Sequence, residues 1–571
     1  MNSLLLIACL TAAPPLTTIS EQSGFTKTGR GDEVEKLCAE FPKRYPGKVK
    51  CERFGTTPLG RPMLALITQT SDAKKKPTLM LQGGIHAGEI DGKDAGFWLL
   101  RELLDGKVAP GALQKMTLVF VPVFNVDGHD RVSPNQRPNQ RGPEEMGWRV
   151  TSQNLNLNRD YAKADAPEMI AMLNFMHRID PILFADLHVT DGAKFQHDVS
   201  VTFEPRRLGP ESLKAWGRTL KAAIFPKIEA QGHLPVDFYP SFDDGDDPAS
   251  GFSSGWPPPR FGSAYWAAQH RFGMLVETHS WRPYAHRVKT TFDVCVTLVE
   301  ETAAHGLEWM AAAKLADDAT RSIAGTQVTL LWDSTQKSEP IDFQGYAYTR
   351  TKSDVSGKFW VQYDESKPVV WKIPLRDELA PFATVEAPKG GYVIAAPVAA
   401  LIAPKLAAHG LSFTTMKKPL PQASVQLFRG APTYRATSYE GRQTVTIKGA
   451  WTDGTEDLPA GSLFVPITQP HADFAMHLLE PTLPDSFASW GFFNAYFEQK
   501  EYLEDYLTEA FAREQLKDPA VKAAFDEKLK DPAFAKDAEA RLAFFAAKHP
   551  SADARLGVLP VYRVATPPAS N

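Results

Sequence analysis

The feature that most constrains the fold is a series of short, almost continuously apolar segments in the first 310 or so residues. They cover residues 62–68, 78–84, 117–124, 182–189 and 273–279. Segments with helical spacing, such as 94–106 and 166–180, lie between them. Strands that are buried on both faces have this apolar character, and the intervening helices cover the sheet. The pattern predicts an α/β domain with a mixed central sheet and helices on both faces.

The chain has 571 residues, which is too long for a single hydrophobic core. After about residue 320 the sequence changes to short strand-like segments separated by turn residues, and after about residue 485 it becomes helical. Two KDPA segments, at 517–520 and 530–533, place an Asp before a Pro, which is typical of helix starts. We predict a leader at 1–20, a catalytic domain at 21–315, a β-rich accessory region at 316–480 and a helical region at 481–571.

Charge and hydropathy exclude some classes of function. The net charge is only −4 and no basic block is present, so we expect no nucleic-acid partner. Beyond the N-terminus no apolar run reaches the ~18 residues of a membrane-spanning helix. The first residues, MNSLLLIACLTAAPPL, resemble a secretory signal although the first ten contain no Lys or Arg. They predict a secreted or periplasmic protein, with lipid anchoring through Cys9 as an alternative.

The cysteines are too few for a disulfide scaffold. Cys38 and Cys51 can pair if the protein is exported, or they can be two separate buried thiols, and the sequence leaves both open. Cys295 lies in a helical segment and is expected in the core.

Candidate catalytic residues follow the ends of three predicted strands. His86 and Glu89 follow 78–84, His188 ends 182–188, and Glu277 ends 273–277. Alone, an H-x-x-E turn is more often incidental than metal-binding. However, sites in open α/β sheets lie beyond the carboxyl ends of strands, so these side chains are expected to meet. Two histidines and a carboxylate form a catalytic zinc set that leaves a fourth position for water.

His188 also has a simpler interpretation, as a capping histidine bonded to Asp186 or Asp191. Asp186 lies two residues earlier, on the same face of the strand. It can equally orient His188 as a metal ligand by accepting a hydrogen bond from its second ring nitrogen.

Four motifs carry a resemblance to a known family. HAGE at 86–89, NLNLNRDY at 154–161, DLH at 186–188 and LVETHS at 275–280 occur in the order and approximate spacing of the carboxypeptidase A-like zinc metallopeptidases. The chain resembles this family over roughly residues 45–300. The resemblance implies a carboxypeptidase-like fold, one Zn²⁺ per chain, and a peptide substrate with a free C-terminus.

The resemblance also implies roles for individual residues. The zinc ligands would be His86, Glu89 and His188, and Glu277 would be the general base. Asn158 and Arg159 would hold the terminal carboxylate, which suits the planar guanidinium of arginine. The family also places an arginine at the oxyanion, for which the loop offers Arg137, Arg141 and Arg149. We favour Arg137.

Two departures from the family pattern stand out. Asn156 occupies the position where the family has an aspartate that accepts a hydrogen bond from a zinc-binding histidine. A neutral acceptor would make that ligand less basic. The family also carries a substrate-binding tyrosine shortly before its catalytic glutamate. The corresponding segment, ASGFSSGWPPPRFG, has none, and Tyr239 and Tyr265 flank it without a clear choice. The side-chain preference is therefore not readable.

Three alternatives compete with a zinc-dependent metallocarboxypeptidase. A zinc deacylase, amide hydrolase or cell-wall peptide amidase can use the same ligand set. A serine hydrolase is suggested only by GFSSG at 251–255, and the prolines after Ser253 do not allow the helix that a nucleophile elbow needs. A binding protein without catalysis has no use for Glu277.

Overall fold

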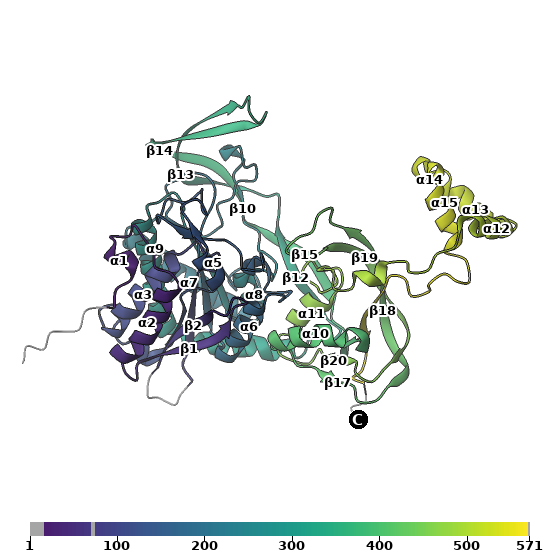
Figure 1. Ribbon diagram of the computed structural model, residues 1–571, viewed down its shortest axis with the longest axis horizontal. Helices are drawn as coiled ribbons and strands as arrows, with labels where there is room; N and C mark the ends of the chain where they lie inside the picture. The colour runs from purple at the N-terminus through teal and green to yellow at the C-terminus, as the bar shows by residue number, and fades with distance from the viewer. Residues whose placement is uncertain (1–15, 70–74, 569–571) are drawn as a thin grey trace, which may run out of the picture.

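The computed structural model describes residues 16–69 and 75–568 (Figure 1). Most of the predicted leader, including Cys9, lies outside the described residues. Residues 16–20 pack onto the domain that follows: Arg101 Nη1 donates to Leu16 O at 2.9 Å, and Thr18 caps α1 (Ile19–Gln22). Within the described ranges no helix has the length and apolar character needed to cross a membrane.

The N-terminal domain is built on an eight-stranded mixed sheet with the order β1-β2-β4-β3-β7-β11-β8-β9. Its strands are β1 (Val49–Thr56), β2 (Pro62–Thr68), β3 (Thr78–Gly83), β4 (Thr117–Val121), β7 (Leu183–Val189), β8 (Val199–Glu204), β9 (Pro235–Val236) and β11 (Phe272–Thr278). The central strands β3 and β7 are buried along their whole length, which their nearly continuous apolar sequences predicted. The predicted α/β fold class is confirmed.

Helices cover both faces of this sheet. Gly92 of α3 (Asp91–Leu104) lies against Leu187 on one face of β7, and Gly262 of α8 (Gly262–Ala268) lies against Asp186 on the other. The remaining helices are α2 (Gly31–Arg44), α4 (Ala112–Lys115), α5 (Val126–Asp130), α6 (Pro167–Ile179), α7 (Glu211–Ala230) and α9 (Tyr284–Thr320). Cys295 is fully buried on α9, as predicted.

The order of the strands positions the site. β3, β7 and β11 are neighbours in the sheet and run parallel to one another. Their carboxyl ends therefore meet at one edge, and His188 and Glu277 are paired residues on adjacent strands. The segment that follows β3 leaves the sheet at Gly84, which has a φ of 62° that only glycine adopts easily.

The accessory region forms several sheets. β12 (Gln327–Ser334) pairs with β15 (Leu379–Glu386), and β13 (Glu339–Lys352) forms a long hairpin with β14 (Phe359–Arg376) that projects from the domain (Figure 1). A six-stranded sheet has the order β17-β20-β16-β21-β18-β19. It contains β16 (Gly391–Ile394), β17 (Thr414–Thr415), β18 (Leu420–Tyr434), β19 (Val445–Leu458), β20 (Leu463–Pro466) and β21 (Val558–Val564), and it is accompanied by α10 (Ala396–Ala408) and α11 (Ala472–Leu479).

The boundaries of these regions differ from the predicted ones. Helix α9 continues to Thr320, past the boundary expected after residue 315. The region expected to be helical contains α12 (Asp505–Gln515), α13 (Pro519–Lys528), α14 (Pro532–Lys536) and α15 (Ala538–Ala546), but its last strand, β21, returns to the six-stranded sheet. Asp518 and Asp531 cap α13 and α14, each ahead of a proline.

The accessory region packs tightly on the first domain, and one hydrophobic core runs through both. Buried Lys405 of α10 donates to the carbonyl oxygens of Lys163 and Ala164, each at 2.8 Å. Arg442 Nε donates to Asp165 at 2.6 Å. These contacts hold the chain segment that directly follows Asn158 and Arg159.

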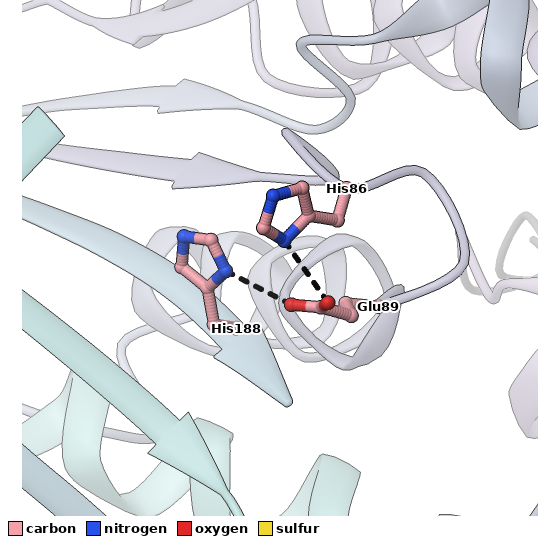
Figure 2. A group of neighbouring side chains, drawn as sticks. All are labelled: His86, Glu89 and His188. Atoms are coloured by element: carbon pink, nitrogen blue, oxygen red, sulfur yellow. Dashed lines mark hydrogen bonds and ion pairs between the residues drawn. The ribbon is translucent and has the colours of Figure 1, made fainter. Parts of the chain in front are cut away.

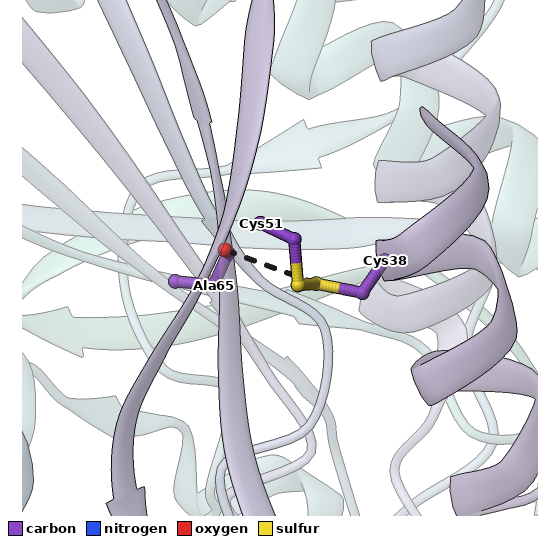
Figure 3. The surroundings of a disulfide bond; sticks show 3 residues. All are labelled: Cys38, Cys51 and Ala65. Atoms are coloured by element: carbon purple, nitrogen blue, oxygen red, sulfur yellow. Dashed lines mark hydrogen bonds between the residues drawn. A yellow bond between two sulfur atoms is a disulfide. The ribbon is translucent and has the colours of Figure 1, made fainter. Parts of the chain in front are cut away.

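Cys38 of α2 and Cys51 of β1 form a disulfide, with their Cα atoms 5.3 Å apart (Figure 3). The bridge therefore joins α2 to the edge strand of the central sheet. Of the two alternatives that the sequence left open, the structure shows the paired one.

Candidate metal centre

The side chains of His86, Glu89 and His188 converge at the edge where β3 and β7 end (Figure 2). His86 Nδ1 lies 3.0 Å from Glu89 Oε1, and His188 Nδ1 lies 2.9 Å from Glu89 Oε2. All three side chains are at least 95% buried. One atom from each lies within 4.8 Å of the others, which is compact enough for one ion.

The outer nitrogens of both imidazoles face oxygen atoms. His86 Nε2 lies 3.1 Å from Asn156 Oδ1, and His188 Nε2 lies 3.0 Å from Asp186 Oδ2. At His86, an Nε2–H that donates to Asn156 leaves the lone pair of Nδ1 directed toward Glu89, whereas the contact of His188 with Asp186 is an ion pair without hydrogen-bond geometry. Two ring nitrogens and a carboxylate face one point, and this donor set fits Zn²⁺. Asn156 thus stands behind His86, where the family has an aspartate.

Burial and neighbouring charges shift the pKa values in this cluster. Burial lowers the pKa of His86 to about 4, so this ring is neutral and able to act as a ligand. Burial also opposes a charge on His188, but Asp186 and Glu89 outweigh it and raise the pKa of His188 well above its usual value. A divalent cation between the rings would take the place of that proton.

Glu277 lies beside this cluster and is 7% exposed. Burial, together with the charges of Glu89 and Asp186, raises its pKa to about 8. Among the residues that the structure describes, its Oε2 atom has no hydrogen-bond partner. A buried carboxylate with an unpaired oxygen is suited to exchange a proton with a bound reactant.

The three candidate arginines have different positions. Arg137 Nη2 lies 3.0 Å from Glu89 Oε1 and 3.2 Å from Asp191 Oδ1, and Arg149 Nη1 lies 3.3 Å from Glu89 Oε1. Arg141 instead binds Glu365 of the accessory hairpin, at 2.5 and 2.8 Å. The structure thus brings Arg137 and Arg149, but not Arg141, to the candidate metal centre.

Asn158 and Arg159 line the same cavity as His86, Glu89 and Glu277, and we call this the catalytic cavity. It has a volume of about 460 Å³. Asn158 Oδ1 accepts a hydrogen bond from Gly262 N at 3.2 Å, so its amide N–H groups are left to donate to a ligand. The Arg159 guanidinium stacks 4.3 Å above the ring of Phe261, which holds it in place. Other lining residues are Val189, Asp191, Thr202, Arg207, Tyr239, Ser253, Ser254, Gly255, Trp256, Pro257, Ser263 and Leu275.

The two candidate tyrosines separate clearly. Tyr239 lines the catalytic cavity, where the charge of Glu277 raises its pKa. Tyr265 is fully buried, and its hydroxyl lies 2.9 Å from His177 and 3.1 Å from His409. The sequence named both tyrosines without choosing between them. The loop that carries Tyr239 packs on the distant accessory hairpin, through Phe238 against Phe343 and Phe242 against Trp371.

Ser253 is not part of a catalytic triad. It lies in the two-residue strand β10 (Phe252–Ser253), which pairs with β14, and its hydroxyl donates to Asp243 at 3.0 Å. The segment that follows is a loop and not a helix, as its prolines predicted.

Comparisons with known proteins find similar proteins for part of the chain. Residues 34–207 match the family described as zinc carboxypeptidase. Mouse carboxypeptidase A4 is 32% identical over 101 residues, which is 17% of this chain and 23% of the relative. An inactive metallocarboxypeptidase of Saccharomyces cerevisiae is 30% identical over 118 residues, 18% of this chain and 27% of the relative. The matched segments thus span about a quarter of either relative.

Among solved structures, a putative carboxypeptidase A from Shewanella denitrificans is similar with a TM-score of 0.36 and 19% identity, over 47% of this chain and 69% of that one. The range matched by the family contains the motifs at 86–89, 154–161 and 186–188. Within its N-terminal domain, the chain is thus similar to the zinc carboxypeptidases.

Proposed function

We propose that this protein is a secreted or periplasmic, zinc-dependent metallocarboxypeptidase that hydrolyses the C-terminal peptide bond of peptides. The observation that carries the proposal is the shared cavity. It brings a His–Glu–His donor set, a buried glutamate, and an Asn–Arg pair suited to a carboxylate to one place. A binding protein would need only part of this arrangement.

His86, Glu89 and His188 would hold one Zn²⁺ through two nitrogens and a carboxylate. When bound, zinc supplies a Lewis acid for the scissile carbonyl and lowers the pKa of water. Asn156 orients His86 by accepting from its Nε2 atom, and Asp186 lies 3.0 Å from His188 Nε2 as its ion-pair partner.

Glu277 would take a proton from the attacking water and deliver it to the leaving amine. Its unpaired Oε2 atom and its raised pKa support this role. Arg137 remains our candidate for stabilising the developing oxyanion. Arg149 lines the cavity and, like Arg137, contacts Glu89 Oε1. Tyr239 is added as a residue that contacts the substrate.

Asn158 and Arg159 would bind the terminal carboxylate, and this makes the enzyme an exopeptidase. The test is a digestion of matched peptides with free and amidated C-termini, read by mass spectrometry. The wild type should release single C-terminal residues from the free peptides only. Arg159→Ala should lose about 10²-fold or more in kcat/KM, because a bidentate charged contact to the substrate is lost.

Equal cleavage of free and amidated peptides would contradict the proposal and favour an amide hydrolase or deacylase. Arg178→Ala is a matched control, because this arginine pairs with Glu52 on the outer surface. It should leave both rates unchanged.

A further inference from the structure

A second cavity, of about 410 Å³, adjoins the catalytic one, and we call it the hairpin cavity. The two share Tyr239 and Asp191 as lining residues. One side of the hairpin cavity is formed by the first domain, through Gly192, Ala193, Pro240, Ser241, Phe242, Gly245 and Asp246. The other side is formed by the accessory hairpin, through Phe359, Trp360, Val361 and Tyr363. The accessory region thus contributes a wall directly beside the candidate catalytic residues.

The hairpin contacts the first domain at its base and also, through Arg350 and Asp246, close to this wall. Phe343 and Trp371 of the hairpin pack with Phe195 and Phe252 of the first domain in a separate hydrophobic cluster. Gln196 N donates to Gln344 O at 2.8 Å. Glu365 binds both Arg141 and Lys194, which lie on two loops at the edge of the site.

The positions of the charged residues indicate which part of a bound peptide would face the hairpin cavity. Asn158 and Arg159, the candidate carboxylate binders, line the catalytic cavity but not the hairpin cavity. Asp191, on the shared wall, binds Arg137, which in turn contacts Glu89. A peptide anchored by its terminal carboxylate therefore passes the candidate metal centre and continues over Tyr239 toward the hairpin.

The chemistry of the hairpin wall is aromatic and partly exposed. Phe359 is 44% exposed and Trp360 is 57% exposed, although both are large apolar side chains. The Arg350 guanidinium stacks 3.9 Å from the ring of Phe359, and its Nη2 donates to Asp246 at 2.9 Å. Binding is stabilised when an apolar side chain of a ligand covers exposed aromatic rings at the rim of a cavity.

We propose that the hairpin cavity binds the residues on the amino side of the scissile bond and selects a large apolar or aromatic side chain there. Trp360 and Phe359 are the specificity-determining residues, and Tyr239 forms the passage between the two cavities. The proposal rests on the proposed carboxypeptidase activity. It gives the accessory region a role in choosing substrates.

The test compares two peptide series with the same C-terminal residue. One series places Phe at each of the three positions before the released residue in turn, and the other has Gly at all three positions. The wild type should prefer Phe at one of these positions by roughly tenfold in kcat/KM. Trp360→Ala should remove most of this preference while leaving the rate on the all-Gly peptide within twofold, and Trp360→Phe should restore much of it.

Phe382→Ala is the matched control, since Phe382 is an exposed aromatic residue of the accessory region that lines neither cavity. It should leave the preference unchanged. A wild type with no preference, or an equal loss on both series in Trp360→Ala, would overturn the proposal.

Binding measurements separate this proposal from the proposed function. Isothermal titration of the Phe and Gly peptides into Glu277→Gln, with and without Trp360→Ala, reports on the hairpin cavity without turnover. If no C-terminal residue is released but Trp360→Ala still weakens binding of the Phe peptide alone, the proposed activity fails and the subsite stands. If binding is the same for both peptides, the subsite fails.

Discussion

Two buried clusters of histidines and carboxylates in this molecule look alike in composition but differ in geometry. At the candidate metal centre, each imidazole directs Nδ1 toward Glu89 and Nε2 toward another oxygen acceptor. At the joint between the first domain and the accessory region, His270 has a carboxylate on each nitrogen, with Asp317 at 3.0 Å and Asp473 at 2.9 Å. We call this second cluster the joint.

The difference lies in how rings and carboxylates alternate. At the candidate metal centre, two rings meet the two oxygens of one carboxylate, at 3.0 and 2.9 Å. At the joint, one ring lies between two carboxylates on its opposite nitrogens. The two aspartates outweigh burial and raise the pKa of His270 to about 9. Residue types alone therefore do not identify a metal site.

The largest expected effect is at the candidate metal centre. His188→Ala should lose both zinc and activity, whereas Glu277→Gln should keep zinc and lose about 10²–10⁴-fold in kcat. His270→Ala should retain zinc, since its cluster has no role in metal binding. Zinc per chain, measured by atomic emission after dialysis, and peptide hydrolysis separate these outcomes. Normal turnover in Glu277→Gln would refute the assigned base.

The next effect concerns the stability of the joint. The folded pKa of His270 lies above its unfolded value of ~6.5, so its contribution is fully present below that pH and is lost as the pH rises through about 9. His270→Gln should therefore lower the free energy of unfolding by up to about 3 kcal/mol at pH 6 and by much less at pH 10.

Urea unfolding of both proteins across this range measures that difference. His549→Gln serves as the control, because this histidine lies in the separate helical region and bonds Ser551. A difference between wild type and His270→Gln that does not change with pH would show that the joint holds a neutral imidazole.

The smallest expected effect concerns Asn156, the hydrogen-bond acceptor behind His86. Asn156→Asp should tighten zinc binding by about tenfold, because a charged acceptor makes the ligand more basic, and Asn156→Ala should weaken it by a similar factor. Competition with a chromogenic chelator measures both. The same affinity in all three proteins would mean that the hydrogen bond at 3.1 Å does not influence the metal.

The strand ends made much of the candidate site predictable. The convergence of four side chains follows from strand order, because parallel neighbouring strands bring their carboxyl ends together. These side chains are His86, Glu89, His188 and Glu277. Among the three arginines, the sequence favoured Arg137, although spacing did not decide between them. Arg141 is drawn away by Glu365, which lies far along the chain and carries no detectable signal near the motif.

The accessory region was less predictable for a related reason. Its strands pair over long separations, and β21 lies between β16 and β18 although helices precede it in sequence. The helical signal of 505–546 was strong and local, so it concealed the strand that follows it. Likewise, the neighbours of Tyr239 pack on a hairpin more than a hundred residues later, with Phe238 against Phe343 and Phe242 against Trp371.

The position of β21 has a consequence for the timing of folding. It is an inner strand of the six-stranded sheet, and it pairs with β16 on one side and β18 on the other. Until residues 558–564 leave the ribosome, these two strands have unpaired edges, and the core that they share with the first domain is incomplete. The α12–α15 segment, inserted between β20 and β21 with its own small core around Phe525, lengthens that interval. A nascent chain therefore exposes unpaired, aggregation-prone strand edges until late in synthesis. Binding by a chaperone would protect it most at that stage.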